Sequence, residues 1–261
     1  MAVKISEKKH WDDFWRRDRD IDEIYDNDGR ITEEIGKRLE IKGMLCLEVG
    51  AATARDSVTL ARSGASAVAL DYSMEALALA ERAAERAGVQ LMLVCGDALN
   101  LPFRDDVFDL VFHQGVLEHF RDPVPFLAEN SRVVRPGGVV LTDVPQTFHI
   151  YTVMKKLLIA AGAWFAGWET QFTRAALCSL LRGSGLEPFG VYGRFFSPSL
   201  AYRILREILA KPGINLPMRP VLVPPIHRLR ETIRKHIEKS SMGPALGYVL
   251  GVFARKPEKN R

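Results

Sequence analysis

Residues 44–71 read MLCLEVGAATARDSVTLARSGASAVALD, and they carry the strongest structural signal in the chain. Two short apolar runs, 44–49 and 66–70, enclose a turn of small residues and a segment with helical spacing. Glu48 lies at the end of the first run, and Asp71 directly follows the second. A buried strand, a tight turn, a helix and a second strand ending in an acid form the first half of a nucleotide-binding βαβ unit. The stretch therefore predicts a site for an adenosine-containing ligand.

The turn differs from the version that binds a dinucleotide. A pyrophosphate-binding turn has the pattern G-x-G-x-x-G, but Ala52 and Arg55 occupy the second and third glycine positions here, so a NAD-linked oxidoreductase is disfavoured. Glu48 would repel a pyrophosphate, whereas it would attract a cation by about 4 kcal/mol at about 4 Å and an effective dielectric of about 20, before desolvation costs. S-adenosylmethionine carries adenosine, a sulfonium and an ammonium, without phosphate. We therefore expect Glu48, Gly50 and Ala52 to line the methionine end of this cofactor.

Short apolar runs and helix-period segments alternate along the rest of the chain. This pattern is typical of an α/β protein in which helices cover both faces of a mostly parallel sheet. We predict seven strands, at residues 44–49, 66–70, 90–95, 107–112, 139–142, 186–194 and 246–255. We predict helices at residues 53–62, 73–88, 128–134 and 174–181, the last of them starting at Thr170 or Thr173.

Composition narrows the class of protein. The chain has 261 residues, 47% of them hydrophobic, which is enough to bury a full core. A net charge of +4 is too small to indicate nucleic-acid binding by itself. The three cysteines lack C-x-x-C spacing and the first ten residues lack an apolar signal core, so we expect reduced thiols in a cytoplasmic protein. The histidines lack metal-ligand spacing, and we expect no metal site.

Further motifs follow the first one in a fixed order. They are Asp71-Tyr72-Ser73, GDALNLPF at 96–103, Phe108-Asp109, GVLEHF at 115–120 and RVVRPGG at 132–138. With these motifs, residues 45–142 resemble the class I S-adenosylmethionine-dependent methyltransferases of the small-molecule type, related to the ubiquinone and menaquinone biosynthesis methyltransferases. The resemblance implies a Rossmann-like seven-stranded sheet in the order 3-2-1-4-5-7-6, with strand 7 antiparallel. Ala52 and Ala54 replace glycines common in the family, and we expect their methyl groups to narrow the methionine pocket.

The resemblance also suggests how the chain is organised. We predict a single methyltransferase domain over residues 1–261, extended by a helical cap. Its parts would be an N-terminal helical arm at 1–40, a cofactor-binding core at 41–147, a cap and helix at 148–185, and the last two strands at 186–261 with an inserted helical segment at 195–244.

Four residues are expected at the adenosine end of the cofactor. Asp71 is placed to accept hydrogen bonds from both ribose hydroxyls, although an acid there could simply stabilise the next helix. Tyr72 could pack on the ribose or adenine, or lie in a surface turn. The resemblance makes Asp97 an acceptor for the adenine amino group and Ala98 a backbone contact. The alternative for Asp97 is a turn-forming residue.

Two histidines are candidates for catalysis. His113 and Gln114 follow the fourth strand, and His119 comes six residues after His113. A histidine with a pKa near neutrality suits general-base work on a phenol or an activated carbon acid, and His113 could also line the cofactor pocket. Locally hydrogen-bonded histidines are the alternative, because methyl transfer by in-line displacement can rely on positioning alone. The motif typical of base methylation, Asn or Asp before two prolines and an aromatic, is missing from this strand end.

Aromatic and apolar segments should set the choice of acceptor. Trp11 and Trp15 lie at helical spacing in a charged stretch, which suggests an amphipathic arm over the cofactor mouth or a helix packed on the sheet. The apolar run at 157–168 is too short to span a bilayer. It could cap an apolar substrate, dip into a membrane surface or form an ordinary buried helix. The predicted substrate-binding residues are Gln114, Tyr151, Trp164 and Trp168.

A basic segment completes the chain's functional signals. Residues 201–240 contain nine lysines and arginines against three glutamates, a net charge of +6, with apolar residues at helical spacing. A solvated helix face, an anionic membrane surface, and a phosphorylated or nucleic-acid substrate all remain open. We expect a methyltransferase for a small, apolar or lipid-like acceptor such as a quinone precursor, cytoplasmic or peripheral to a membrane. An RNA-directed methyltransferase and a non-catalytic S-adenosylmethionine-binding protein are the alternatives.

Overall fold

The structure is a computed structural model. It describes residues 29–161, 169–195, 212–217, 224–240 and 242–258, together with Trp11, Asp12, Trp15, Tyr202, Leu205, Arg206, Ile208 and Leu209.

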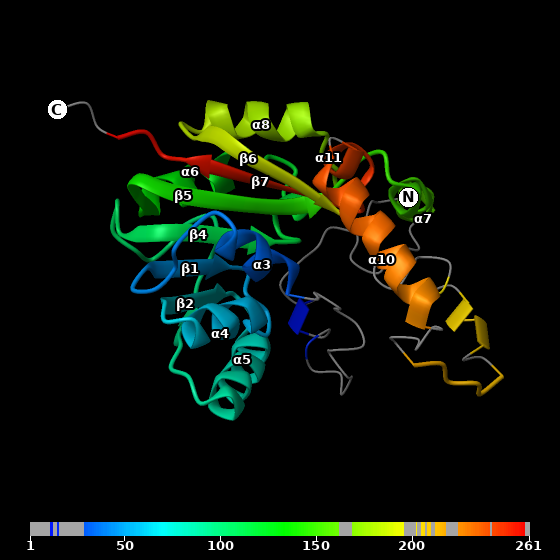
Figure 1. Ribbon diagram of the computed structural model, residues 1–261. Coiled ribbons are helices and arrows are strands. Elements are labelled where there is room, and N and C mark those ends of the chain that lie inside the picture. The colour runs from blue at the N-terminus through cyan, green and yellow to red at the C-terminus, as the bar shows by residue number, and fades with distance from the viewer. Residues whose placement is uncertain are drawn as a thin grey trace.

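Seven strands form one mixed sheet (Figure 1). They are β1 Leu45–Val49, β2 Ser66–Asp71, β3 Met92–Cys95, β4 Phe108–Gln114, β5 Val134–Pro145, β6 Glu187–Arg194 and β7 Val249–Arg255. Their order is β3-β2-β1-β4-β5-β7-β6, and β7 runs antiparallel to both of its neighbours. The predicted strand order and the antiparallel last strand are therefore confirmed.

Helices lie on both faces of the sheet. They are α3 Arg30–Gly36, α4 Arg55–Arg62, α5 Met74–Ala87, α6 Val124–Val133, α7 Ile150–Ala160, α8 Arg174–Gly183, α10 Pro224–Lys239 and α11 Met242–Leu246, with a short 3-10 turn η1 at Leu117–His119. Side chains alternate between two core clusters, as the period of a strand requires. In β1, Leu47 packs in the cluster that includes α6 and α8, whereas Cys46 packs in the one that includes α3 and α4.

Local sequence signals explain most of the helix boundaries. The Ser73 side chain accepts a hydrogen bond from the amide of Ala76, and Gly88 ends α5 with φ at +65°. Thr173, one of the two candidates for the start of α8, caps that helix through the Ala176 amide. These N-caps satisfy amide groups that have no partner inside the helix.

Several predicted boundaries were wrong, and the two largest shifts are at α6 and β5. The helix expected at 128–134 begins at Val124, because Pro123 presets the helical turn and Asp122 accepts from the Val124 amide. Residues 135–138, between the helix predicted at 128–134 and the strand predicted at 139–142, belong to β5, whose pairing with β4 shifts register between Phe108 and Leu110. A Cβ at Gly138 would lie 2.9 Å from the Arg135 carbonyl oxygen, so this irregular stretch requires glycine.

A buried polar network ties the chain before β1 to the end of β5. The Arg30 guanidinium lies 2.8 Å from Asp143, and the Tyr192 hydroxyl donates to the other oxygen of the same carboxylate at 2.6 Å. Asp143 is 1% exposed. Removing one partner of such a buried pair typically costs about 3 to 5 kcal/mol, because the remaining charge is left uncompensated. The network thus fixes α3 and β6 against the carboxyl end of β5.

The cap helices gather at that same end of the sheet. Figure 1 shows α7, α10 and α11 beyond the tips toward which β4 and β5 point. The Gln146 side chain, just after β5, donates to the Ala245 carbonyl in α11, and α11 packs on β6. The described part of the predicted insertion thus contains α10 and α11 as well as the non-helical residues 212–217, and the two helices stand beside the edge where parallel α/β sheets bind their ligands.

Candidate cofactor and active site

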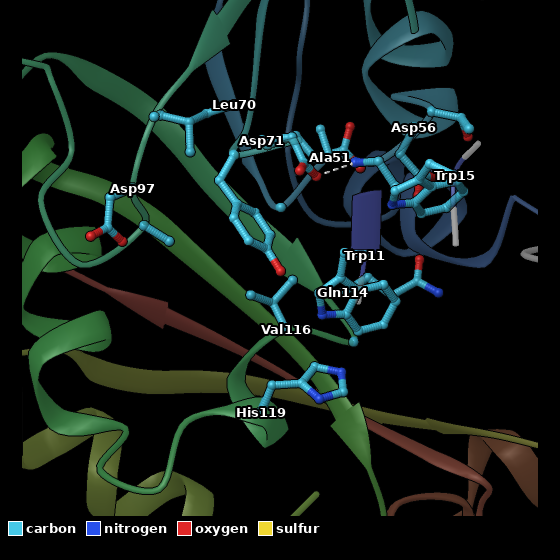
Figure 2. A pocket seen from close by; sticks show the side chains of 18 of the residues that line it. Trp11, Trp15, Ala51, Asp56, Leu70, Asp71, Asp97, Gln114, Val116 and His119 are labelled. Atoms are coloured by element: carbon cyan, nitrogen blue, oxygen red, sulfur yellow. Dashed lines mark hydrogen bonds between the residues drawn. The ribbon is translucent and has the colours of Figure 1, made fainter. Parts of the chain in front are cut away.

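A pocket of about 360 Å³ opens at the carboxyl ends of β1, β2, β3 and β4. It lies within the size range of small-molecule sites. In Figure 2, Asp97 and Leu70 lie toward one end of the pocket, and Trp11 and His119 toward the other. Its walls come from the turn after β1, the end of β2, the loop after β3 and the segment between β4 and η1.

The turn after β1 is tied to the end of β2. The amides of Gly50 and Ala51 both donate to the Leu70 carbonyl, at 2.8 and 3.0 Å. Gly50 has φ at +68°, and a Cβ there would lie 2.6 Å from a methyl group of Val116. Glycine is therefore needed at this position for both conformation and space.

The two alanines of the turn have different roles. Both adopt left-handed backbone, with φ at 50° for Ala52 and 51° for Ala54, a conformation that costs a non-glycine residue roughly 1–2 kcal/mol. Ala52 lines the pocket, whereas Ala54 is fully buried beside Ala69 and Ala80 and does not line it. The expected narrowing of the pocket by two methyl groups therefore applies to Ala52 alone.

Glu48 reaches the pocket from the end of β1. Its side chain is buried, and Oε2 accepts hydrogen bonds from the amide and the hydroxyl of Ser57 at the start of α4. Burial raises the pKa of this carboxyl above its ordinary value, the charges of Asp56 and Asp71 raise it further, and the Ser57 hydrogen bonds oppose the shift. A cation bound in the pocket would lower this pKa by compensating the buried negative charge.

Asp71 is held rigidly at the tip of β2. Oδ2 accepts from the Ala52 amide at 2.8 Å, and Oδ1 accepts from the Ser73 amide at 2.9 Å. Burial raises the pKa of Asp71, while these amides favour the charged form. A carboxylate accepts about four hydrogen bonds, so Asp71 keeps acceptor capacity for a ribose hydroxyl beyond its bonds to backbone amides. Tyr72, half-buried, lines the pocket next to it.

The loop after β3 forms the opposite end of the pocket. Gly96, Asp97 and Ala98 all line it. One carboxylate oxygen of Asp97 accepts from the Leu99 amide at 2.9 Å, which fixes the side chain in a turn. Asp97 thus forms the local turn that was the alternative interpretation, and it also faces the pocket.

The two histidines lie in different environments. His119 lines the pocket, and its ring lies edge-on to Trp11, with centroids 5.3 Å apart. His113 is completely buried in the core, where its ring lies edge-on to Phe126 and its Nε2 is 3.1 Å from the Thr142 hydroxyl. Burial lowers the pKa of His113 to about 3. Contrary to expectation, His113 does not line this pocket, and its geometry suits neither catalysis nor cofactor binding there.

The remaining predicted residues are distributed as follows. Trp11 and Trp15 line the pocket, as expected of an arm over the cofactor mouth, and Gln114 lines it as well. Tyr151 is not among the lining residues, and its ring packs edge-on to Tyr248 at 5.4 Å. Trp164 and Trp168 lie outside the described residues.

Several lining residues were missed by the sequence interpretation. They are Ala51, Thr53, Arg55, Asp56, Leu70, Gly96, Gly115, Val116 and Phe120. Val116 and Phe120 belong to the quoted GVLEHF motif, so the motif marked this wall although only its histidine was singled out. Asp56 could have been found as an acid in the first turn of the helix that follows the cofactor turn. Within the described ranges, no group of three His, Cys, Asp or Glu side chains is arranged to hold a metal ion.

The Glu48 environment predicts a specific pH dependence. Because the native pKa is raised, the folded chain keeps a proton that the unfolded chain releases, so this contribution to stability is lost as pH rises from the ordinary glutamate range through the raised pKa. The ammonium group that S-adenosylhomocysteine shares with the cofactor favours the charged form of Glu48. We expect affinity for S-adenosylhomocysteine, measured by titration calorimetry, to rise between about pH 5.5 and about pH 7.5.

Glu48→Gln should remove most of this pH dependence and weaken binding about 10- to 100-fold, since a hydrogen-bonded charge is lost. Glu81→Gln, on the exposed side of α5, is the matched control and should bind like the wild type. Wild-type affinity of Glu48→Gln at both pH values would refute the assigned role of this carboxylate.

The family model matches the part of the chain that supplies most of the pocket. Residues 47–142 match the family model described as a methyltransferase domain. A ubiquinone biosynthesis O-methyltransferase of Dinoroseobacter shibae is 28% identical over 65% of this chain and 72% of its own length. A demethylmenaquinone methyltransferase of Mycolicibacterium paratuberculosis is 39% identical over 46% of this chain, and the match spans 50% of that relative.

Solved structures share the fold at low sequence identity. A magnesium protoporphyrin IX methyltransferase from Synechocystis, solved with S-adenosylhomocysteine bound, has a TM-score of 0.59 at 14% identity and covers 95% of this chain and 93% of its own. The cyclase SpnF has a TM-score of 0.60 at 20% identity, with 88% and 81% covered. These likenesses concern the fold alone.

Three independent findings agree on the identity of the chain. They are the match of residues 47–142 to a methyltransferase domain, the related methyltransferases, and the sheet order with its pocket at the carboxyl edge. The chain carries a methyltransferase domain at residues 47–142 on a Rossmann-like fold, and these findings support an S-adenosylmethionine-dependent methyltransferase with S-adenosylmethionine as its cofactor.

Proposed function

We propose that the enzyme methylates a hydroxyl oxygen or an activated ring carbon of a small, apolar, quinone-related acceptor. One observation carries the proposal: the wall of the pocket around His119 is apolar and aromatic. Trp11, Val116 and Phe120 form it, with His119 and Gln114 as its polar members. Such a wall suits a flat ring that presents a single polar group.

The residues expected to bind the cofactor would also determine which way its methyl group points. With ribose on Asp71 and the methionine end on Gly50 and Glu48, the methyl group would point toward the His119 side of the pocket. The acceptor atom attacks the methyl carbon in line with the leaving sulfur. The carbon–sulfur bond breaks as the new bond forms, and neutral S-adenosylhomocysteine remains. Most of the acceleration then comes from holding the acceptor about 3 Å from the methyl carbon in a site that excludes water.

His119 is the proposed proton acceptor. It lies in η1 and lines the pocket, and its ring lies edge-on to Trp11. A neutral imidazole can take the proton that a phenolic hydroxyl or a carbon acid loses as methylation proceeds. His113 is not part of this mechanism.

Related proteins support the quinone class. Ubiquinone biosynthesis O-methyltransferases and demethylmenaquinone methyltransferases are among the relatives. Their names denote methylation in the biosynthesis of apolar quinones, and the apolar wall of this pocket fits the same class. The free thiols of Cys46, Cys95 and Cys178 fit the reducing cytoplasm that we propose for the enzyme.

The RNA-directed alternative rests on the basic segment at 201–240, of which the structure describes a part. Arg234 is ion-paired with both Glu231 and Glu238, and Arg194 pairs with Glu238 as well. Charges neutralised inside the protein do not release counterions from a nucleic acid. Of the nine basic residues of that segment, Arg234 is thus paired within the protein, while Arg228 and Lys235 remain exposed.

The acceptor can be identified directly. The protein is incubated with methyl-labelled S-adenosylmethionine and, separately, with the lipid and the water-soluble fractions of a cell extract. We expect the label in an apolar, ring-containing compound of the lipid fraction, identified by mass spectrometry. Label in RNA or only in water-soluble metabolites would contradict the proposed acceptor class while leaving the methyltransferase activity intact.

A histidine pair tests the proposed base. With the identified acceptor, His119→Ala should lower kcat about 10²- to 10⁴-fold with little change in cofactor affinity, and the wild-type rate should fall below about pH 6.5. His113→Ala should lower thermal stability, because it opens a cavity in the core, and the folded fraction should keep its kcat. Near-normal kcat in His119→Ala, together with a flat pH profile, would show that positioning alone drives catalysis.

A further inference from the structure

Helix α10 turns its charged side toward the protein. The Arg234 guanidinium lies 2.6 Å from Glu231 and 3.1 Å from Glu238. Glu238 also pairs with Arg194 of β6 at 3.1 Å and accepts from the Phe195 amide at 3.0 Å. The polar groups that would normally face water thus hold the helix to the body of the protein.

The outer side of α10 is apolar and cationic. Leu229 is 64% exposed and Ile233 is 51% exposed. Their spacing of four residues places them in one stripe on the helix. Arg228 and Lys235, also exposed, lie together along one side of that stripe, with the exposed Thr232 and His236 between. This arrangement reverses the usual surface helix, which buries its apolar stripe and exposes its charges.

Helix α7 has the same reversed arrangement. Lys155 is 2% exposed and pairs with the buried Glu169, and the Thr152 hydroxyl donates to the Gln146 carbonyl at 2.7 Å. Leu157, by contrast, is 68% exposed. Val153 and Met154 are also exposed, and Lys156 lies beside them. A lysine side chain is rarely buried unless it is paired. Here the paired lysine points inward, while apolar side chains of the same helix are exposed.

The two helices are connected at the carboxyl edge of the sheet. The ring of His149, the N-cap of α7, lies 6.4 Å from the ring of Phe195, whose amide bonds Glu238 of α10. Figure 1 shows both helices at the end of the sheet toward which β4 and β5 run. The substrate pocket opens at that edge too.

Charge indicates what covers these faces. Among the described residues of α7 and α10, the exposed charged side chains are Lys156, Arg228 and Lys235, and all are positive. The occupant must therefore be apolar where the leucines and isoleucine enter it and negative where the cations lie. A bilayer with anionic headgroups offers both layers in that order. No helix within the described ranges has the length and apolarity to cross a membrane, so contact would be with the surface.

We propose that the outward side chains of α7 and α10 form a docking face for an anionic phospholipid membrane. This docking face consists of Val153, Met154, Leu157, Leu229 and Ile233 with Lys156, Arg228 and Lys235. It would hold the pocket mouth close to a source of apolar acceptors. The proposal goes beyond methyl transfer and does not require the acceptor to be a quinone.

Vesicle sedimentation of the full chain tests the docking face. We expect the protein to pellet with phosphatidylglycerol-containing vesicles and to remain in solution with pure phosphatidylcholine, and salt should weaken the binding. The triple variant Leu157→Ser, Leu229→Ser and Ile233→Ser should bind at least about tenfold more weakly. Neutralising Lys156, Arg228 and Lys235 to Gln should cost about fivefold for each charge.

A matched control uses exposed apolar residues at the opposite edge. Met92 starts β3 and Val107 precedes β4, and both are exposed. Met92→Ser with Val107→Ser should bind vesicles like the wild type. S-adenosylhomocysteine affinity should be unchanged in all variants, which separates loss of docking from loss of fold or of cofactor binding.

Three results would overturn the proposal. They are wild-type protein that ignores anionic vesicles, equal binding to both vesicle types without salt dependence, and docking-face variants that pellet like the wild type. Self-association of the wild type in the ultracentrifuge, abolished by the triple serine variant and without vesicle binding, would instead assign the face to a second copy of the chain.

Discussion

The site depends on one arrangement: backbone amides that converge on the tip of β2. The amides of Ala52 and Ser73 hold the Asp71 carboxylate, while those of Gly50 and Ala51 bond the Leu70 carbonyl. These hydrogen bonds fix the turn after β1 against the end of β2 and hold Asp71 in the pocket wall. Buried carboxylates are costly unless they are hydrogen-bonded, so the turn and the acid require each other.

A second constraint is the placement of charge in the cap. Glu169 and Glu238 are buried and draw Lys155, Arg194 and Arg234 inward. Apolar side chains of α7 and α10 then face outward, where a normal surface helix would carry its charges. The same buried pairs thus hold the cap helices and determine which residues they present at the edge beside the pocket. Fold, pocket and outer surface are linked through these few ion pairs.

Features that depend on neighbouring residues in the sequence were predicted well. Features that depend on pairing with distant residues were predicted less well. Alternating apolar runs and the caps at Ser73 and Thr173 act within a few residues, so the strands and helices could be found from sequence. The strand order came from the family resemblance, because periodicity does not encode it. The β5 boundary was wrong since the bulge opposite Phe108 depends on pairing with β4.

The positions of the two histidines show the same limit of prediction from local sequence, now at the site. We expected the fourth strand to end at Phe112, which would free His113 to face the ligand edge. The strand instead continues to Gln114, and its alternation turns His113 toward Phe126 and leaves Gln114 in the pocket wall. The length of a strand end is set by its neighbours, and β5 pairs with β4 as far as Gln114. Residues in the first motif were easier to place, since turn geometry there follows from the sequence itself.

A crystal structure with S-adenosylhomocysteine tests the central claim most directly. The account predicts both ribose hydroxyls within about 2.6–3.2 Å of the Asp71 carboxylate, the amino group facing Glu48 past Gly50, and the sulfur directed toward His119. A ligand bound elsewhere, or one whose ribose does not contact Asp71, would contradict it.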